Sequence, residues 1–189
     1  VSRGNLCCLR IPNNEVKELY QSTILDWFER SLDEHKYRML LSSLIAGDVD
    51  TFSQIFQQFV CSSASIFDVS GSEPERIYHA FVLGMLIGLR DRYEVKSNRE
   101  SGLGRYDVML IPKNKHALGI IMEFKKIGPF KKMDLKVAAN SALQQIEEKK
   151  YAQELLDRKI ERILYIAIVF EGKNVLILSK PRSLPKIAQ

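Results

Sequence analysis

Two short apolar runs with a polar segment between them stand out in the hydrophobic pattern of the chain. The runs are 108–111 and 118–122, and the residues at 112–115 are Pro-Lys-Asn-Lys. Apolar runs of this length fit β-strands, and a proline followed by polar residues is typical of a turn. The pattern therefore predicts a β-hairpin just past the middle of the sequence.

Apolar residues at helical spacing precede this hairpin, from Ile11 to about Phe67. Such spacing places the apolar side chains on one face of each helix. We expect three helices there. The first is capped by Asn13 or Asn14, the second covers 34–46 and ends at Gly47, and the third is capped by Asp48 or Asp50.

A fourth helix is predicted after a segment rich in serine and glycine. Ser72 and Glu75 have the spacing of a capping box, and Pro74 between them is tolerated in a first helical turn. The positions after Tyr78 are apolar on nearly all sides, so we expect a buried helix that runs to about Arg92.

The remaining elements follow from the same rules. They are a strand at 93–99, a long helix at 134–158, a buried central strand at 162–170 and a further strand at 175–178. With the hairpin, this order predicts a mixed sheet flanked by helices, an α/β fold of the α+β kind. The domains that we expect are a helical N-terminal extension or connector at 1–70, a core at 71–180 and a tail at 181–189.

Charged side chains lie at one end of the predicted hairpin. Asp107 enters its first strand, and Glu123 and Lys125 leave its second. Because side chains two residues apart on a strand point to the same face, Glu123 and Lys125 should lie side by side. Carboxylates can hold Mg²⁺, and a lysine beside them can stabilise developing negative charge. A solvated surface ion pair is the commoner meaning of the spacing taken alone.

The wider sequence resembles a nuclease family. The residues that carry the resemblance are Tyr78-His79-Ala80-Phe81, 97–102, Gly104-Arg105-Tyr106-Asp107, Ile121-Met122-Glu123-Phe124-Lys125, and Gln145-Ile146 through Tyr151. They are similar to the bacterial PD-(D/E)XK domain that commonly follows an AAA-ATPase-like domain in one polypeptide. The similarity covers about 11–178. Tyr106 departs from the pattern, since the superfamily name has proline there.

The resemblance implies a restriction-endonuclease-like αβββαβ core behind the N-terminal helical extension. It also implies hydrolysis of phosphodiester bonds, in DNA above all, with Mg²⁺ or Mn²⁺. By the match to the motif, Asp107 and Glu123 would hold the metal, together with the backbone carbonyl of Phe124. Lys125 would position or activate the attacking water. Gln145 would face the site and help to position water or backbone; the alternative is an exposed glutamine.

Four further residues each have more than one interpretation. Glu75 is either an additional catalytic acid or only the partner of Ser72 in the capping box. His79 either contacts metal, water or phosphate, or is a hydrogen-bonded buried histidine. Glu100 either joins the metal or holds Arg105, and Arg105 either grips a phosphate, braces an acid or is an ordinary surface arginine.

A basic loop follows the proposed site. Its residues Lys126, Lys131 and Lys132 could track a phosphate backbone or simply be solvated. The net charge of +5 mildly favours a polyanionic partner, that is, nucleic acid.

Composition narrows the class of protein. The 189 residues, 46% hydrophobic and 27% charged, suit one soluble globular domain, and no apolar run approaches a membrane span. Cys7, Cys8 and Cys61 lack metal-ligand spacing and favour a reducing, cytoplasmic compartment. Because the chain begins with Val1, we expect it to be a fragment of a longer protein, in which an ATPase-like domain could precede it.

The sequence leads to three hypotheses about function, each for a different class of protein. The first is a Mg²⁺-dependent nuclease that acts on DNA, and symmetric nucleases often pair as homodimers to cut two strands. The alternative is a recognition or regulatory module, attached to an ATPase-like protein, that binds nucleic acid or protein without cleaving. A purely structural module is the third, and it predicts affinity for neither metal nor nucleic acid.

Overall fold

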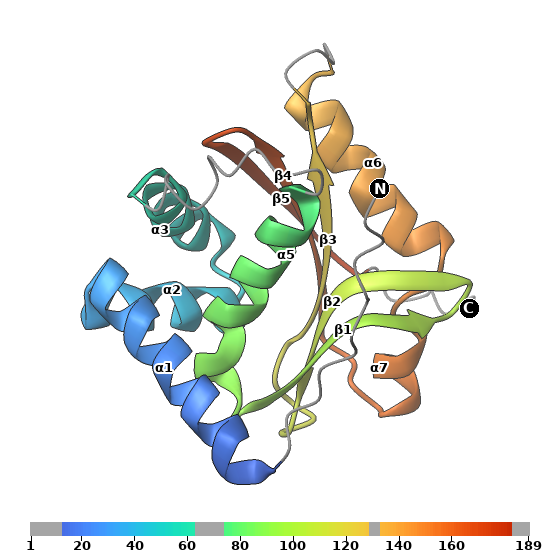
Figure 1. The fold of residues 1–189 in the computed structure, drawn as a ribbon. Coiled ribbons are helices and arrows are strands. Elements are labelled where there is room, and N and C mark those ends of the chain that lie inside the picture. Colours follow the sequence, from blue (N-terminus) through green and yellow to red (C-terminus); the bar gives the residue numbers. More distant parts are fainter. Residues whose placement is uncertain (1–12, 63–73, 129–132, 183–189) are drawn as a thin grey trace, which may run out of the picture.

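One mixed sheet of five strands forms the centre of the described part of the computed structural model (Figure 1). The described residues are 13–62, 74–128 and 133–182, with the backbone alone described at 74–76. In the order in which they lie side by side, the strands are β1 (Tyr93–Ser101), β2 (Gly104–Pro112), β3 (Gly119–Lys126), β4 (Ile163–Glu171) and β5 (Asn174–Pro181). β3 runs parallel to β4, and the other neighbours are antiparallel. The predicted hairpin is confirmed as β2 and β3.

Helices cover both faces of this sheet (Figure 1). Those on one face are α1 (Asn14–Leu32), α2 (Glu34–Ala46), α3 (Val49–Ser62) and α5 (Pro74–Met85), which continues as the 3-10 helix η1 (Leu86–Leu89). Those on the other face are α6 (Leu135–Glu148) and α7 (Gln153–Asp157). The order confirms the predicted αβββαβ core behind a helical N-terminal region. Among the described helices, none is long and apolar enough to cross a membrane.

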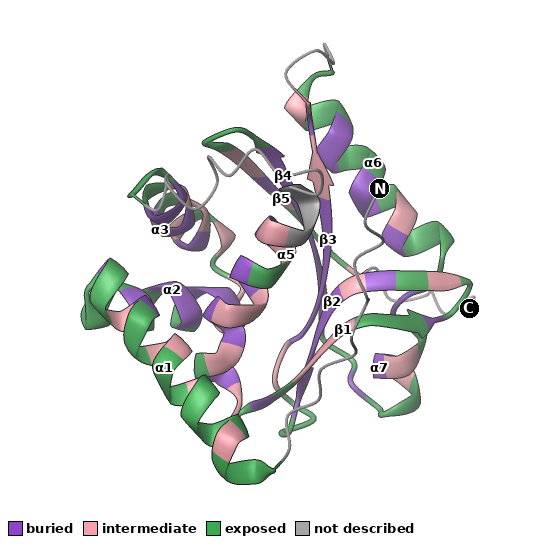
Figure 2. Ribbon diagram, in the orientation of Figure 1, coloured by how far each residue is buried: buried purple, intermediate pink, exposed green. Residues whose placement is uncertain are grey.

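Two apolar cores lie on opposite faces of the sheet (Figure 2). Successive residues of β3 alternate between them: Ile120 and Met122 belong to the core under α1–α3 and α5, and Ile121 belongs to the core under α6 and α7. Nearly every residue of β4 is also buried, which explains why its sequence has almost no polar interruption. The two cores fix β3 and β4 from both sides, so side chains at the strand ends have defined positions.

The N-terminal helices begin and end as the sequence predicts. Asn13 caps α1 by accepting a hydrogen bond from the Val16 amide at 2.9 Å, and Gly47 ends α2 with a φ of 82°. Leu19 and Tyr20 depart from expectation, because they belong to the apolar spacing of α1 but are 65% and 59% exposed. α1 packs into the core through its C-terminal half, so these two residues of its first half remain in solvent.

The long helix predicted at 134–158 is wrong, because the chain breaks there into α6 and α7. At the break Lys150 adopts a left-handed conformation with φ 53°, and the buried side chain of Tyr151 turns inward. The carbonyl of Tyr151 accepts a 2.8 Å hydrogen bond from Ser101 Oγ, 50 positions away in sequence. The β1–β2 turn thus packs against the break, and a contact between residues so far apart leaves no local sequence signal.

The strands predicted at 93–99 and 175–178 are present and are longer than expected, as β1 and β5. Pro181, expected in the tail, is the last residue of β5. Ser72, one partner of the expected capping box, lies outside the described residues. The boundary at 70 stays a prediction; α1–α3 and α5 share one apolar core.

Gly102, in the β1–β2 turn, leads to a stability prediction. Its φ is 62°, and an added Cβ would lie 2.3 Å from the carbonyl oxygen of Lys150. We expect Gly102→Ala to lower the free energy of unfolding by more than about 2 kcal/mol, because both the backbone conformation and the close contact oppose a side chain. Chemical denaturation measures this loss.

Gly172→Ala is the matched control for that variant. Gly172 has a similar φ of 58°, but apart from its chain neighbours no atom of the described residues lies within 4 Å of the Cβ that alanine would add. Its loss should be about 1 kcal/mol, the cost of the left-handed conformation alone. Equal losses for the two variants would contradict a tight contact at Gly102.

Candidate active site

Two carboxylates from neighbouring strands meet at one end of the β2–β3 hairpin. Asp107 belongs to the beginning of β2 and Glu123 to the end of β3. Asp107 Oδ2 accepts a 2.7 Å hydrogen bond from the backbone amide of Phe124, the residue that follows Glu123. On the other side, His79 Nε2 lies 3.2 Å from the carbonyl oxygen of Asp107. The Asp107 backbone and side chain are therefore held by α5 and β3 together.

Glu123 is a buried carboxyl with one oxygen that lacks a partner. The residue is 4% exposed, and its Oε1 accepts hydrogen bonds from Gln145 Nε2 at 2.6 Å and from Lys125 Nζ at 3.1 Å. Its Oε2 is buried and has no hydrogen-bond partner among the described residues. Burial in the first place, and the nearby charge of Asp107 in the second, raise the pKa of Glu123 to about 7. This carboxyl is held in place but incompletely satisfied.

Gln145, on α6, joins Glu123 and Lys125. While its Nε2 donates to Glu123, its Oε1 accepts from Lys125 Nζ at 2.8 Å. Its Nε2 also lies 3.2 Å from the hydroxyl of Tyr151, which follows the end of α6. The small residues of α6, such as Ala142, are buried against the sheet and bring Gln145 close to β3. The lysine and the acid are thus fixed by a third side chain.

The oxygen atoms of this site suit a hard divalent cation. Two acids and one lysine lie together, and Glu123 Oε2, which has no hydrogen-bond partner in the described part of the chain, is an oxygen that can donate to a metal ion. Mg²⁺ prefers such oxygens and commonly needs one or two carboxylates, with waters completing its shell. Among the described residues, no group of three His, Cys, Asp or Glu side chains gathers as a ligand set. Of the acids expected at this site, Asp107 and Glu123 are the two whose described side chains could hold an ion together.

Two further acids, Glu75 and Glu100, were expected at the catalytic or metal site. Glu75 belongs to α5, but its side chain lies outside the described residues. Glu100 is exposed near the end of β1, where it is paired in register with Arg105, and both residues line a hollow of about 760 Å³. Glu100 is not brought into a ligand group with Asp107 and Glu123 among the described residues.

The expected nucleic-acid contacts are partly described. His79 contacts the Asp107 carbonyl, and because a carbonyl can only accept, His79 Nε2 carries the proton. Lys126 places Nζ 5.8 Å from the centre of the Tyr78 ring, so it turns away from Lys125 toward α5. Arg105 is exposed. The expected contacts Lys131 and Lys132 lie outside the described residues.

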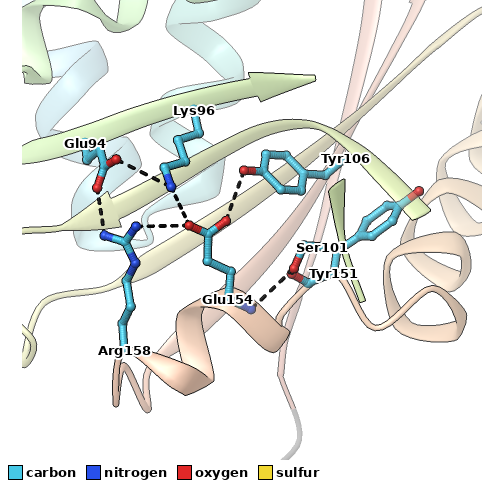
Figure 3. A network of polar contacts seen from close by, with 7 residues as sticks. All are labelled: Glu94, Lys96, Ser101, Tyr106, Tyr151, Glu154 and Arg158. Atoms are coloured by element: carbon cyan, nitrogen blue, oxygen red, sulfur yellow. Dashed lines mark hydrogen bonds and ion pairs between the residues drawn. The ribbon is translucent and has the colours of Figure 1, made fainter. Parts of the chain in front are cut away.

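A polar network behind the site was not expected from the sequence (Figure 3). Its centre is Glu154 of α7, which accepts from Lys96 at 2.5 Å, from Arg158 at 3.0 Å and from the Tyr106 hydroxyl at 3.3 Å. Arg158 also binds Glu94 at 2.7 Å, and this hydrogen bond lowers the pKa of Glu94. The network fastens α7 to β1 and β2, and α7 follows directly after Tyr151.

Tyr106 occupies the position at which the resemblance led us to expect proline. It is fully buried, its ring packs edge-to-face on Tyr151 with centres 6.3 Å apart, and burial raises its pKa. Tyr151 in turn contacts Gln145. The tyrosine that stands in place of proline therefore packs on Tyr151, and Tyr151 contacts Gln145 in the candidate site.

Comparison with protein families matches the larger part of the chain. A family model described as the PD-(D/E)XK nuclease superfamily matches residues 73–180, which include α5, α6, α7 and all of the sheet except the last residue of β5. A comparison with curated proteins finds no significant match.

Proposed function

Because the chain belongs to the PD-(D/E)XK nuclease superfamily, which indicates a nuclease-type function, we propose that it hydrolyses phosphodiester bonds in DNA with a divalent metal ion. The observation that carries the proposal is the buried Glu123 carboxyl, which lies beside Asp107 and is hydrogen-bonded to Lys125. These are the three side chains of the motif. Their geometry supports hydrolysis more than a solvated surface ion pair, because Glu123 is not solvated.

Asp107 and Glu123 would hold the ion, Mg²⁺ or Mn²⁺, and the backbone carbonyl of Phe124 is the proposed third ligand. When bound, such an ion lowers the pKa of a water ligand and neutralises charge that develops on a phosphodiester. The unpartnered Glu123 Oε2 supports this assignment, since a buried oxygen without a partner is costly unless something binds it.

Lys125 would act on the attacking water and the phosphate. Its ammonium group donates hydrogen bonds and carries positive charge, so it can orient a water for in-line attack and stabilise negative charge on the phosphate oxygens. Gln145 positions it by accepting one of its hydrogen bonds, while the Gln145 amide nitrogen binds Glu123. Each polar group thus has one defined direction before substrate binds.

The remaining assignments complete the proposal. Glu75 would be an additional acid from α5, and the phosphate contacts would be Arg105, His79, Lys126, Lys131 and Lys132. Glu100 has weaker support as a metal ligand, because it is exposed in a separate hollow with Arg105. We further propose that the active form is a homodimer, since two copies can cut both strands, and that an ATPase-like domain accompanies this one.

Cleavage assays test the proposal directly. Supercoiled plasmid, single-stranded DNA and RNA are each incubated with Mg²⁺, Mn²⁺ or EDTA. We expect products from DNA with either ion and none with EDTA, because the paired acids need the cation to act on a phosphate. Gel electrophoresis of the products measures the outcome.

Asp107→Asn is the inactive reference in the same assay. Asparagine keeps an oxygen that can accept the Phe124 amide hydrogen bond, but it removes the negative charge. Unchanged cleavage by a pure preparation of this variant would refute the assigned site. Binding of metal or nucleic acid by the folded wild-type protein without any product would instead favour the non-cleaving module.

A further inference from the structure

A hollow of about 320 Å³ lies at the end of the sheet opposite to the candidate active site. The residues that line it, here named the basic hollow, are Lys115, His116, Lys159, Glu161 and Arg162. They come from the β2–β3 connection and from the segment between α7 and β4. The catalytic residues lie where β2 begins and β3 ends, and the basic hollow lies where β2 ends and β3 begins.

The cations of the basic hollow have no carboxylate partner within the described residues. Lys115, Lys159 and Arg162 are exposed, and no ion pair joins any of them to Glu161 or to another described acid. Three positive side chains and one negative side chain thus surround one concave space. Like charges repel, so three such groups at one hollow favour an anion between them.

The neighbouring cations on the same side of the sheet behave differently. Lys96 and Arg158 are both paired with Glu94 and Glu154 in the network behind the active site (Figure 3). Their charge is used to fasten α7 to β1, so little of it is available to a ligand. In contrast to Lys96 and Arg158, the cations of the basic hollow keep positive charge that a ligand outside the described residues can use.

The two segments that form the basic hollow are held relative to each other by the sheet. The Gly119 amide donates a 2.8 Å hydrogen bond to the Arg162 carbonyl, and Gly119 is paired in register with Ile163. Within the turn, the His116 amide donates to Asn114 Oδ1 at 3.0 Å. Charged groups on a fixed frame lose less entropy when an anion binds than the same groups on a loose segment.

We propose that the basic hollow binds the phosphate backbone of the nucleic-acid substrate at a distance from the bond that is cut. The inference rests on the proposed function. From Gly119 to Glu123 the chain of β3 advances about 13 Å, at about 3.3 Å per residue. One strand of a duplex rises about 3.4 Å per nucleotide, so the contacted phosphates lie about four or more nucleotides from the scissile one.

Charge reversal at the basic hollow tests this site. The double variant Lys115→Glu plus Lys159→Glu is compared with Lys17→Glu plus Lys36→Glu, which changes exposed lysines on α1 and α2. Each pair of changes lowers the net charge from +5 to +1, so general electrostatic attraction falls equally. Affinity for a long fluorescent duplex is measured by anisotropy in EDTA, where no cleavage is needed, over a range of salt concentrations.

We expect the hollow variant to bind about tenfold or more weakly than the control variant, because two phosphate contacts are lost. The slope of log affinity against log salt should fall by about two for the hollow variant, close to one per lost contact. Thermal melting of both variants verifies that each is folded.

The outcomes separate this inference from the proposed function. A loss of duplex affinity that is specific to the hollow variant supports the basic hollow as a binding site, even if neither the wild type nor any variant cleaves DNA in the plasmid assay. Equal affinities of the two variants, or no binding by the wild-type protein, overturn the inference, and normal cleavage by the hollow variant would then leave the proposed function intact. Preserved duplex affinity with loss of an acidic protein partner would also overturn it.

Discussion

Replacing Lys125 with methionine should lower metal-dependent cleavage by about 10²- to 10⁴-fold, the range typical of losing a positioned proton-transfer or charge-stabilising group. Methionine keeps most of the length of the lysine side chain and removes its charge and its hydrogen bonds to Glu123 and Gln145. Single-turnover cleavage of a labelled duplex measures the effect.

Lys126→Met is the matched control, since the neighbouring residue undergoes the same chemical change. Strand alternation directs Lys126 away from Lys125, and its Nζ lies over the Tyr78 ring. As a proposed phosphate contact, it should cost no more than about tenfold in cleavage, through weaker substrate binding. Equal losses for the two variants would show that the two lysines matter only through their charge, and Lys125 would lose its catalytic assignment.

Glu123→Gln should abolish cleavage and at the same time stabilise the protein at neutral and alkaline pH. In the folded state the pKa of Glu123 is raised from 4.5 to about 7, mainly by burial. The unfolded chain therefore releases this proton at lower pH than the folded chain does, so stability falls as the pH rises from about 4.5 to 7 and then stays lower. The full difference corresponds to about 3 kcal/mol, at about 1.4 kcal/mol per pKa unit.

Denaturant unfolding at pH 4 and at pH 8, without metal, measures this gain. The variant should match the wild type at pH 4, where Glu123 is protonated, and exceed it by up to about 3 kcal/mol at pH 8. Glu171→Gln, at an exposed carboxyl that ends β4, should show no such gain. A Glu123→Gln variant that is less stable than wild type at pH 8 would contradict the unfavourable burial of this charge.

Metal addition gives a second readout on the same variant. If Glu123 Oε2 is a ligand, Mg²⁺ should raise the melting temperature of the wild type at pH 8, since a ligand that binds the folded state stabilises it. Glu123→Gln should lose most of this increase. An equal increase in both proteins would place the ion elsewhere.

Local sequence signals predicted most of the fold. The Asn13 cap and the glycine that ends α2 are short-range patterns, and the structure confirms both. The mixed sheet with helices on both faces was also predictable, because two adjacent apolar runs can pair as a hairpin and a long buried run needs cover on both faces. Such signals depend on residues within a few positions of one another, so they can be recognised in a single sequence.

The break between α6 and α7 shows where local signals end. The helical pattern of 134–158 has no glycine or proline at Tyr151, yet the chain turns there. The turn is stabilised by the β1–β2 connection through Ser101 and by the Tyr106 ring, both distant in sequence. Packing between such segments overrides helix propensity, and the hydrophobic periodicity of a sequence does not show which distant segments will pack together.

For the site, the sequence by itself determined which residues are proposed to carry the chemistry, because the motif names Asp107, Glu123 and Lys125, and it placed them on the hairpin strands that the structure confirms. The tertiary structure alone decided that Glu123 is buried with a raised pKa and with one oxygen that no described residue hydrogen-bonds, and that Gln145 bonds both the acid and the lysine. The physical reason is that desolvation depends on every group around a charge, whichever part of the chain supplies it.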